Sequence, residues 1–135
     1  MFLVNELGVR LINHFGWPEI ADIDVSYADA LVTVTVTGEV DVSNTAWLHD
    51  TLQDAIDSGA AEVILDVGGL TFMDSTGLAV LQGAHERMQS DSRTFTIQRP
   101  APRMMQLLKV SELLPVLNIR RLRTSPKTQV PASRR

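Results

Sequence analysis

The chain contains no cysteine among its 135 residues. This absence excludes disulfides, thiolate catalysis and cysteine-ligated zinc. No run of apolar residues approaches the length that a transmembrane helix needs. The N-terminal residues lack a basic leader and a small-residue cleavage site, so they do not match the pattern of a signal peptide. We therefore expect a cytoplasmic protein that does not associate with membranes.

Basic residues are scarce outside the C-terminal segment. The chain has 12 Lys and Arg residues against 16 Asp and Glu residues, and a net charge of -4. Residues 120–135 hold 6 of the basic residues and none of the acidic ones. The acidic remainder argues against direct binding of nucleic acid, because duplex affinity rests largely on basic groups that neutralise phosphates. Residues 123–135 are polar and contain proline, and we expect a disordered basic tail there.

Hydrophobic periodicity predicts strands in the first half of the chain. Hydrophobic residues make up 44% of the sequence, which is enough for a core. Strict alternation at 31–38 predicts a strand with one buried face, paired in a hairpin with 22–27. A nearly continuous run of β-formers at 61–67 predicts a strand covered on both faces, and Gly68 and Gly69 are expected to end it.

Three segments have the apolar spacing of amphipathic helices, and two further runs are typical of strands. The helices are expected at 45–58, from 74 to about 88, and at 101–114, and the strands at 93–98 and 116–122. The element order is β-β-α-β-α-β-α-β. This order predicts a single α/β domain over residues 21–122, in which helices cover a mixed β-sheet.

Residues 1–20 stand apart from this pattern. Val4, Leu7, Leu11 and Phe15 have helical spacing, which fits an amphipathic helix that covers the core or meets a second subunit, as in a homodimer. A packed or partly ordered N-terminal extension is the simpler interpretation, and we favour it.

The stretch FMDSTGL at 72–78 places polar residues where a strand-like run gives way to a helix-like one. Either Asp74 or Ser75 suits the N-cap of the second helix. Ser75 could instead be a nucleophile, part of a phosphate or metal site, or the target of a kinase.

A nucleophilic serine receives little support from the sequence. The residues around Ser75 are M-D-S-T-G, which lack the first glycine of the hydrolase motif G-x-S-x-G. His14, His49 and His85 all lie in predicted helices, and none is placed as a partner base. His85, on an apolar stripe, is better explained as a half-buried core residue. We therefore predict no catalytic residue and no enzyme.

A phosphate-binding loop receives little support either. Gly68, Gly69 and Gly77 have neither the spacing of a P-loop nor that of a dinucleotide-binding motif, and turn geometry explains them better. The helix start at Asp74 still offers backbone N–H groups to an anion, so weak nucleotide binding stays open. We predict no cofactor.

A metal site would use Asp66 and Asp74, with Asp41 as a third ligand. These carboxylates offer fewer oxygens than a hard cation prefers. We predict no metal site, and expect Asp66 to bond to the backbone or to a neighbouring side chain. A helix cap and a modification site remain the two open interpretations of Ser75.

Two segments resemble the signature of the STAS domain family, the sulfate-transporter and anti-sigma-factor-antagonist family. The DSTGL stretch at 74–78 resembles the family's Asp-Ser-Ser/Thr-Gly-Leu motif. The GEVDVSNTAWL stretch at 38–48 resembles its Gly-Glu-Leu-Asp segment, which leads into the first helix. The predicted element order agrees, and the resemblance covers residues 22–120.

The resemblance implies a site for phosphorylation and partner binding. In the family's bacterial anti-sigma factor antagonists, a partner serine kinase phosphorylates the Ser that follows the motif's Asp. That kinase is also the anti-sigma factor. Carried over, the phosphorylation site is Ser75, with Thr76 as the alternative. The implied partner-binding residues are Asp41, Asp74, Ser75, Thr76 and Gly77.

The function that the resemblance implies is that of an anti-sigma factor antagonist. The unmodified chain is expected to bind the anti-sigma serine kinase and free a sigma factor for transcription, and phosphorylation at Ser75 is expected to release the kinase. The alternative is a ligand-sensing STAS module that binds a nucleotide or anion, or a scaffold of a larger regulatory assembly.

Overall fold

Five strands form one mixed sheet, and they lie in it in the order in which they occur along the chain. The computed structural model describes residues 2–3, 12–13 and 21–121. The strands of the sheet are β3 (Ala21–Ala28), β4 (Leu31–Val40), β5 (Glu62–Met73), β6 (Thr94–Gln98) and β7 (Asn118–Arg120). β3 and β4 are antiparallel, as predicted for a hairpin, and the pairs from β4 to β7 are parallel.

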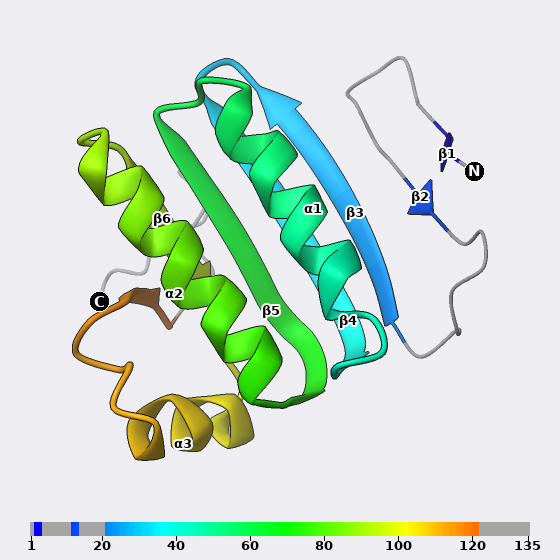
Figure 1. The fold of residues 1–135 in the computed structure, drawn as a ribbon, viewed down its shortest axis with the longest axis vertical. Helices are drawn as coiled ribbons and strands as arrows, with labels where there is room; N and C mark the ends of the chain where they lie inside the picture. The colour runs from blue at the N-terminus through cyan, green and yellow to red at the C-terminus, as the bar shows by residue number, and fades with distance from the viewer. Residues whose placement is uncertain (1, 4–11, 14–20, 122–135) are drawn as a thin grey trace, which may run out of the picture.

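Three helices connect the parallel strands. They are α1 (Thr45–Asp57), α2 (Ser75–Ser90) and α3 (Pro102–Val110). Figure 1 shows α1 and α2 together on one face of the sheet, with α3 across the end of the sheet where β5 passes into α2. Within the described part of the chain, no helix is long and apolar enough to cross a membrane. From β3 onward, the element order confirms the predicted α/β fold.

The alternating strand β4 has the buried face that its sequence predicts. Val32, Val34 and Val36 are at most 1% exposed, whereas Thr33 and Thr35 lie half-buried on the other face. The predicted apolar stripe of α1 is buried too, and consists of Leu48, Leu52, Ala55 and Ile56. Because each fully buried aliphatic side chain contributes about 1.5–3 kcal/mol, this layer between helices and sheet is a main source of stability.

Strand β5 is longer than predicted, because Gly68 and Gly69 do not end it. A Cβ on Gly68 would lie 2.5 Å from the guanidinium carbon of Arg99, and a Cβ on Gly69 would lie 2.7 Å from a methyl of Thr37. At both positions glycine thus allows close packing inside the strand and does not mark a turn. The strand continues to Met73, with a register shift against β4, and delivers the polar stretch at the edge of the sheet.

Helix α3 and strand β7 are shorter than predicted. The helix ends at Val110, because Glu112 adopts a left-handed backbone with φ of 65°. The chain then turns, so Leu113 and Leu114 both donate their N–H groups to the carbonyl of Leu108. Strand β7 is confined to three residues, Asn118–Arg120.

The N-terminal segment contains two short strands. β1 (Phe2–Leu3) pairs with β2 (Ile12–Asn13) in antiparallel fashion. The residues whose spacing suggested an amphipathic helix, Val4, Leu7, Leu11 and Phe15, lie outside the described residues. So does the predicted basic tail at 123–135.

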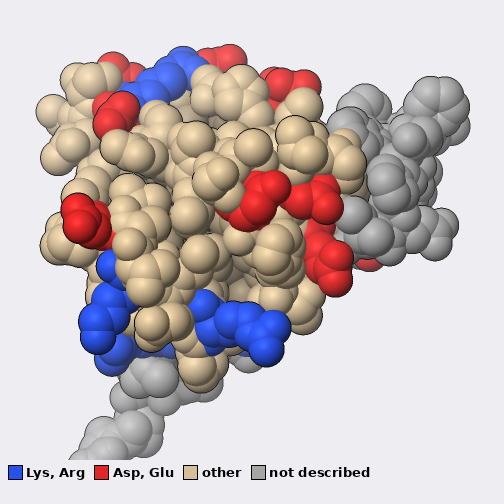
Figure 2. All heavy atoms as spheres, turned by 60° about the horizontal axis from the view of Figure 1, so that its bottom comes forward, with Lys and Arg blue, Asp and Glu red and all other residues tan. Residues whose placement is uncertain are grey.

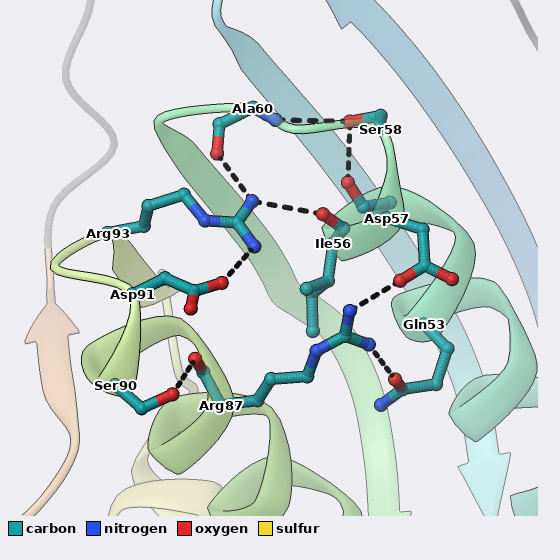
Figure 3. Close-up of polar contacts among 10 residues, drawn as sticks. Gln53, Ile56, Asp57, Ser58, Ala60, Arg87, Ser90, Asp91 and Arg93 are labelled. Carbon is teal, nitrogen blue, oxygen red and sulfur yellow. Dashed lines mark hydrogen bonds and ion pairs between the residues drawn. The ribbon is translucent and has the colours of Figure 1, made fainter.

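Two arginines fasten the C-terminal ends of α1 and α2 together (Figure 3). Arg87 of α2 donates to the side chains of Gln53 and Asp57 on α1. Arg93 donates to the main-chain carbonyl of Ile56 at 2.9 Å. These contacts lie at the end of the helices remote from the start of α2, where the polar stretch at residues 74–76 lies (Figure 1).

Candidate functional site

The candidate site lies where β4 and β5 end. Parallel strands bring their carboxyl ends to the same edge of a sheet, and Val40 of β4 pairs with Met73 of β5. The N–H of Asp74 donates to the carbonyl of Val40 at 3.1 Å. In return, the N–H of Val42 donates to Asp74 Oδ2 at 3.2 Å. The two segments that carry the family motifs are therefore held against each other.

Asp74 is the N-cap of α2. Its Oδ1 accepts from the Thr76 hydroxyl at 2.5 Å, from the Thr76 N–H at 2.9 Å and from the Gly77 N–H at 3.3 Å. The hydrogen bond from the Thr76 hydroxyl has the largest effect, and together with the backbone hydrogen bonds it outweighs burial and holds the pKa of Asp74 below its ordinary value. The structure thus selects Asp74 over Ser75 as the capping residue.

Asp41 organises the loop between β4 and α1. Its carboxylate accepts from the N–H of Ser43 at 2.9 Å and from the hydroxyl of Ser43 at 2.6 Å. Asn44, which is 2% exposed, accepts from the N–H of Asp41 and donates to the carbonyl of Glu39, both at 3.0 Å. The loop therefore has a defined shape, set by its own side chains, beside the start of α2.

The hydroxyl groups of the site differ sharply in their surroundings. Thr76 Oγ1 lies 2.7 Å from Thr45 Oγ1 and also donates to Asp74, and the Thr76 side chain is half-buried. Ser75 is exposed at the first position of α2. Among the described residues, none hydrogen-bonds to the Ser75 hydroxyl. Ser75 is therefore the accessible hydroxyl of the pair.

Gly77 contributes to packing rather than to the surface. It is buried in the first turn of α2, and a Cβ there would lie 2.5 Å from Met73 Cγ. Met73 is 2% exposed, so this contact is buried. Gly77 thus allows α2 to begin directly against the end of β5, which fixes the position of the residues between them.

The site lacks the arrangement of an activated nucleophile. A nucleophilic serine needs a base within hydrogen-bond reach, and the described residues offer Ser75 none. His49 is exposed on α1 and pairs with Asp50 at 3.2 Å. His85 lies half-buried on α2, as its position on the apolar stripe predicts.

Asp66 takes no part in this site. Its carboxylate accepts from Arg99 Nε and Nη2, each at 3.0 Å, from Gln98 at 3.0 Å and from the N–H of Gly68 at 2.9 Å. Burial raises the pKa of Asp66, but these hydrogen bonds and the charge of Arg99 outweigh burial and hold the pKa below its ordinary value. The expectation that Asp66 bonds to its neighbours is confirmed. Within the described residues, no three His, Asp or Glu side chains come together as metal ligands.

The structure thus brings Asp41, Asp74, Ser75 and Thr76 together at one edge of the sheet, with Gly77 beneath them. The contribution of Thr45 was missed. Its hydroxyl holds Thr76, and this contact depends on the parallel pairing of β4 with β5, which no local pattern reveals.

The family described as "Mlab, STAS domain" matches residues 23–117. The chain therefore belongs to the STAS domain family, as its two motifs predict.

Relatives of the chain include anti-sigma factor antagonists. The anti-sigma-B factor antagonist of Bacillus subtilis (strain 168) is 24% identical over 98 residues, which cover 73% of this chain and 89% of that protein. The crystal structure of an anti-sigma factor antagonist from Mycobacterium paratuberculosis matches with a TM-score of 0.69 and 18% identity, over 76% of this chain and 87% of that one. The Bacillus cell fate determinant SpoIIAA, in its phosphorylated form, matches with a TM-score of 0.61 and 21% identity, over 78% and 94% respectively. At these identities the two structures show a shared fold.

Proposed function

We propose that the chain is an anti-sigma factor antagonist that binds an anti-sigma serine kinase and is switched off by phosphorylation at Ser75. Through this switch it regulates sigma-factor-dependent transcription in the cytoplasm, without catalysing a reaction itself. The observation that carries the proposal is the exposed Ser75 hydroxyl, unbonded among the described residues, at the position of the family motif. The likeness to anti-sigma factor antagonists supports the same function.

The surroundings of the two hydroxyls favour Ser75 over Thr76 as the acceptor. A kinase has to reach and orient the hydroxyl that it modifies. Phosphorylation of Thr76 would break its hydrogen bonds to Asp74 and Thr45. It would also place the phosphate against the carboxylate of Asp74, which caps α2. Ser75 can be modified without breaking a hydrogen bond.

A phosphate on Ser75 is expected to change binding rather than folding. Phosphorylation adds about -1.5 to -2 charge at neutral pH. The dipole of α2 favours an anion at this end by about 0.3–1 kcal/mol, which offsets repulsion from Asp74. A partner that covers Asp41 and Asp74 would have to desolvate the added charge, and a mispaired charge in an interface costs about 2–5 kcal/mol.

The alternative of a nucleotide or anion sensor has less support from the geometry. Asp74 Oδ1 already accepts the N–H groups of Thr76 and Gly77. An anion that approaches the start of α2 therefore meets a carboxylate whose pKa is lowered. Tight, stoichiometric binding of GTP or ATP in calorimetry would favour the sensor.

The proposal is tested with the host's anti-sigma serine kinase. The kinase and ATP should place one phosphate on Ser75, mapped by mass spectrometry, and Ser75→Ala should lose it while binding the kinase as the wild type does. Ser75→Glu should weaken binding by about tenfold or more, because about 1.4 kcal/mol corresponds to tenfold and a carboxylate carries less charge than a phosphate. The melting temperature should stay nearly unchanged.

Thr76→Ser is the matched control, since it keeps a hydroxyl next to Asp74. It should be phosphorylated on Ser75 like the wild type. Equal affinity of the phosphorylated and unmodified proteins for the kinase would show that Ser75 is no switch. A phosphate mapped to Thr76 would keep the mechanism and correct the residue.

A further inference from the structure

An apolar groove of about 370 Å³ opens beside the candidate site, between the end of β5 and α3. Its apolar walls are Leu70, Phe72 and Met73 of β5 and Met104, Leu107 and Val110 of α3. Met73 joins the groove to the site, because it lines the groove, precedes Asp74 and packs over Gly77. The groove therefore ends, at Met73, two residues before Ser75 along the chain.

The rim of the groove exposes large apolar side chains. Phe72 is 49% exposed and Val110 is 64% exposed. Exposed apolar side chains gathered around a hollow are a mark of interaction surfaces. A small ligand inside the groove would leave both side chains in water, whereas a protein segment lying along the groove would cover them.

The charges beside the groove indicate the chemistry of that segment. Four of the seven described Lys and Arg side chains pair with a carboxylate, namely Arg87, Arg93, Arg99 and Arg120. The other three, Arg103, Lys109 and Arg121, are exposed and form no ion pair within the described part of the chain.

These three unpaired cations line the two hollows that flank α3. Arg103 lines the groove itself, and Lys109 and Arg121 line an adjoining hollow on the other side of α3. Figure 2 shows this end of the molecule, with basic side chains along the lower border and others at the upper border beside acidic ones. The surface of α3 thus carries positive charge that nothing among the described residues neutralises.

We infer that the groove binds an amphipathic segment of the kinase partner, with its apolar face against Phe72 and Val110 and acidic residues toward Arg103. The inference rests on the proposed function for the identity of the partner. An apolar helix face laid in a groove is a common mode of peptide recognition. The concave shape of the groove suits a segment of polypeptide better than a flat anionic lipid surface.

This arrangement explains how phosphorylation of Ser75 would act on the bound segment. A phosphate on Ser75 stands at the Met73 end of the groove, so it repels the acidic residues of a segment that lies there. The phosphate and the acidic residues carry like charges that would be close and partly desolvated. Their repulsion is therefore stronger than that of the same charges in bulk water. Docking in the groove and release by phosphorylation are then two properties of one surface.

The test compares groove variants with a matched control, using the purified kinase without ATP. Phe72→Ser combined with Val110→Ser should weaken binding by about tenfold or more. Val116→Ser makes the same change at an apolar residue that is 46% exposed and does not line the groove, and should alter affinity by about twofold at most. Thermal unfolding of each variant shows whether the fold is kept.

A charge reversal tests the chemistry of the segment. Arg103→Glu should weaken binding, and the loss should shrink as the salt concentration rises. A kinase in which an acidic residue of the segment is changed to Lys should bind Arg103→Glu more tightly than the unchanged kinase does. The same kinase should bind the wild type more weakly. Unchanged affinity of Arg103→Glu would overturn an acidic segment as the occupant.

The Ser75→Glu variant separates this inference from the proposed function. If Ser75→Glu weakens kinase binding and the groove variants do not, the inference falls and the switch stands. If the groove variants weaken binding and Ser75→Glu does not, the groove assignment stands and the switch falls. A kinase that binds none of the proteins, the wild type included, overturns both.

Two further measurements address other occupants. The first is sedimentation with vesicles of phosphatidylglycerol and phosphatidylethanolamine. If the wild type sediments with them and the double variant Phe72→Ser with Val110→Ser does not, the groove binds lipid and the inference is overturned. A dimer that the same double variant dissociates would assign it to a second copy of the chain and also overturn it.

Discussion

The Asp66 carboxylate links β5 directly to β6, and to β7 by way of Arg99. Asp66 lies on β5, accepts a hydrogen bond from Gln98 of β6 and forms a two-point pair with the guanidinium of Arg99. The backbone N–H of Arg99 in turn donates to the carbonyl of Arg120 on β7 at 2.8 Å. Arg99 has a left-handed backbone with φ of 58°, a conformation that costs a non-glycine residue about 1–2 kcal/mol. The pair with Asp66 offsets that strain, so the two residues form one structural unit.

Asp66→Asn should lower the free energy of unfolding at pH 7 by about 1–3 kcal/mol, because it removes a buried, charge-assisted acceptor. The pKa of Asp66 is lowered in the folded chain, so its stabilising effect is present above the unfolded pKa of about 3.9 and is lost as pH falls through the folded value. The difference between the wild type and the variant should therefore narrow as the pH falls below about 5, and close once the pH is below the folded pKa of Asp66. Urea unfolding at a series of pH values measures it.

Asp29→Asn is the control for this prediction. Asp29 is exposed in the turn between β3 and β4 with φ of 54°, a conformation that Asn also adopts readily. Its stability should stay within about 0.5 kcal/mol of the wild type. A pH-independent difference for Asp66→Asn would contradict the role of the ionised carboxylate.

At the scale of elements, two glycines of α2 should respond in opposite ways to alanine. Gly77→Ala would press a methyl into Met73, and overpacking of this kind costs about 1–3 kcal/mol, more than the gain in helix propensity of up to about 1 kcal/mol. Gly83→Ala meets no atom within 4 Å, so only the gain remains. Denaturant midpoints should fall for Gly77→Ala and rise for Gly83→Ala. A rise of the denaturant midpoint for both variants would mean that the Met73 side chain moves aside without cost.

The regular elements could be predicted from local sequence because each follows one periodicity. The alternation of β4 and the stripe of α1 are set by burial on a single face, and both are found as predicted. The extension of β5 could not be predicted, since Gly68 and Gly69 suit a turn as well as close packing against Arg99 and Thr37. The early end of α3 depends on the left-handed backbone of Glu112, which no propensity announces.

The candidate site was predictable in its residues but not in its geometry. Asp74 and Ser75 stand at a visible change of period, and the family resemblance placed Asp41 with them in partner binding. The contact between Thr45 and Thr76 arises only when two distant strands pair in parallel. The apolar groove arises only when α3 packs beside β5. Tertiary contacts of this kind leave no local signature.

At the scale of the whole molecule, stability should be highest in the middle of the sheet. Residues 63–67 lie in β5, which is paired on both sides over most of this stretch, and Val63, Leu65 and Val67 are 0% exposed. Their amides should exchange only through the largest unfolding events, while those of residues 124–135 should exchange freely. Hydrogen exchange followed by mass spectrometry measures both. Strong protection at 124–135 together with fast exchange at 63–67 would contradict this architecture.

The agreement between strand order in the sheet and strand order along the chain has a consequence for biosynthesis. Each new strand adds beside the one made before it, so none has to be inserted between two that are already paired. Contacts close in sequence are also the ones that form fastest, because short loops lose little entropy on closing. A nascent chain leaving the ribosome can therefore assemble the sheet in the order of translation. The segment that holds Ser75 is then in place before α3, the second wall of the groove, has been made.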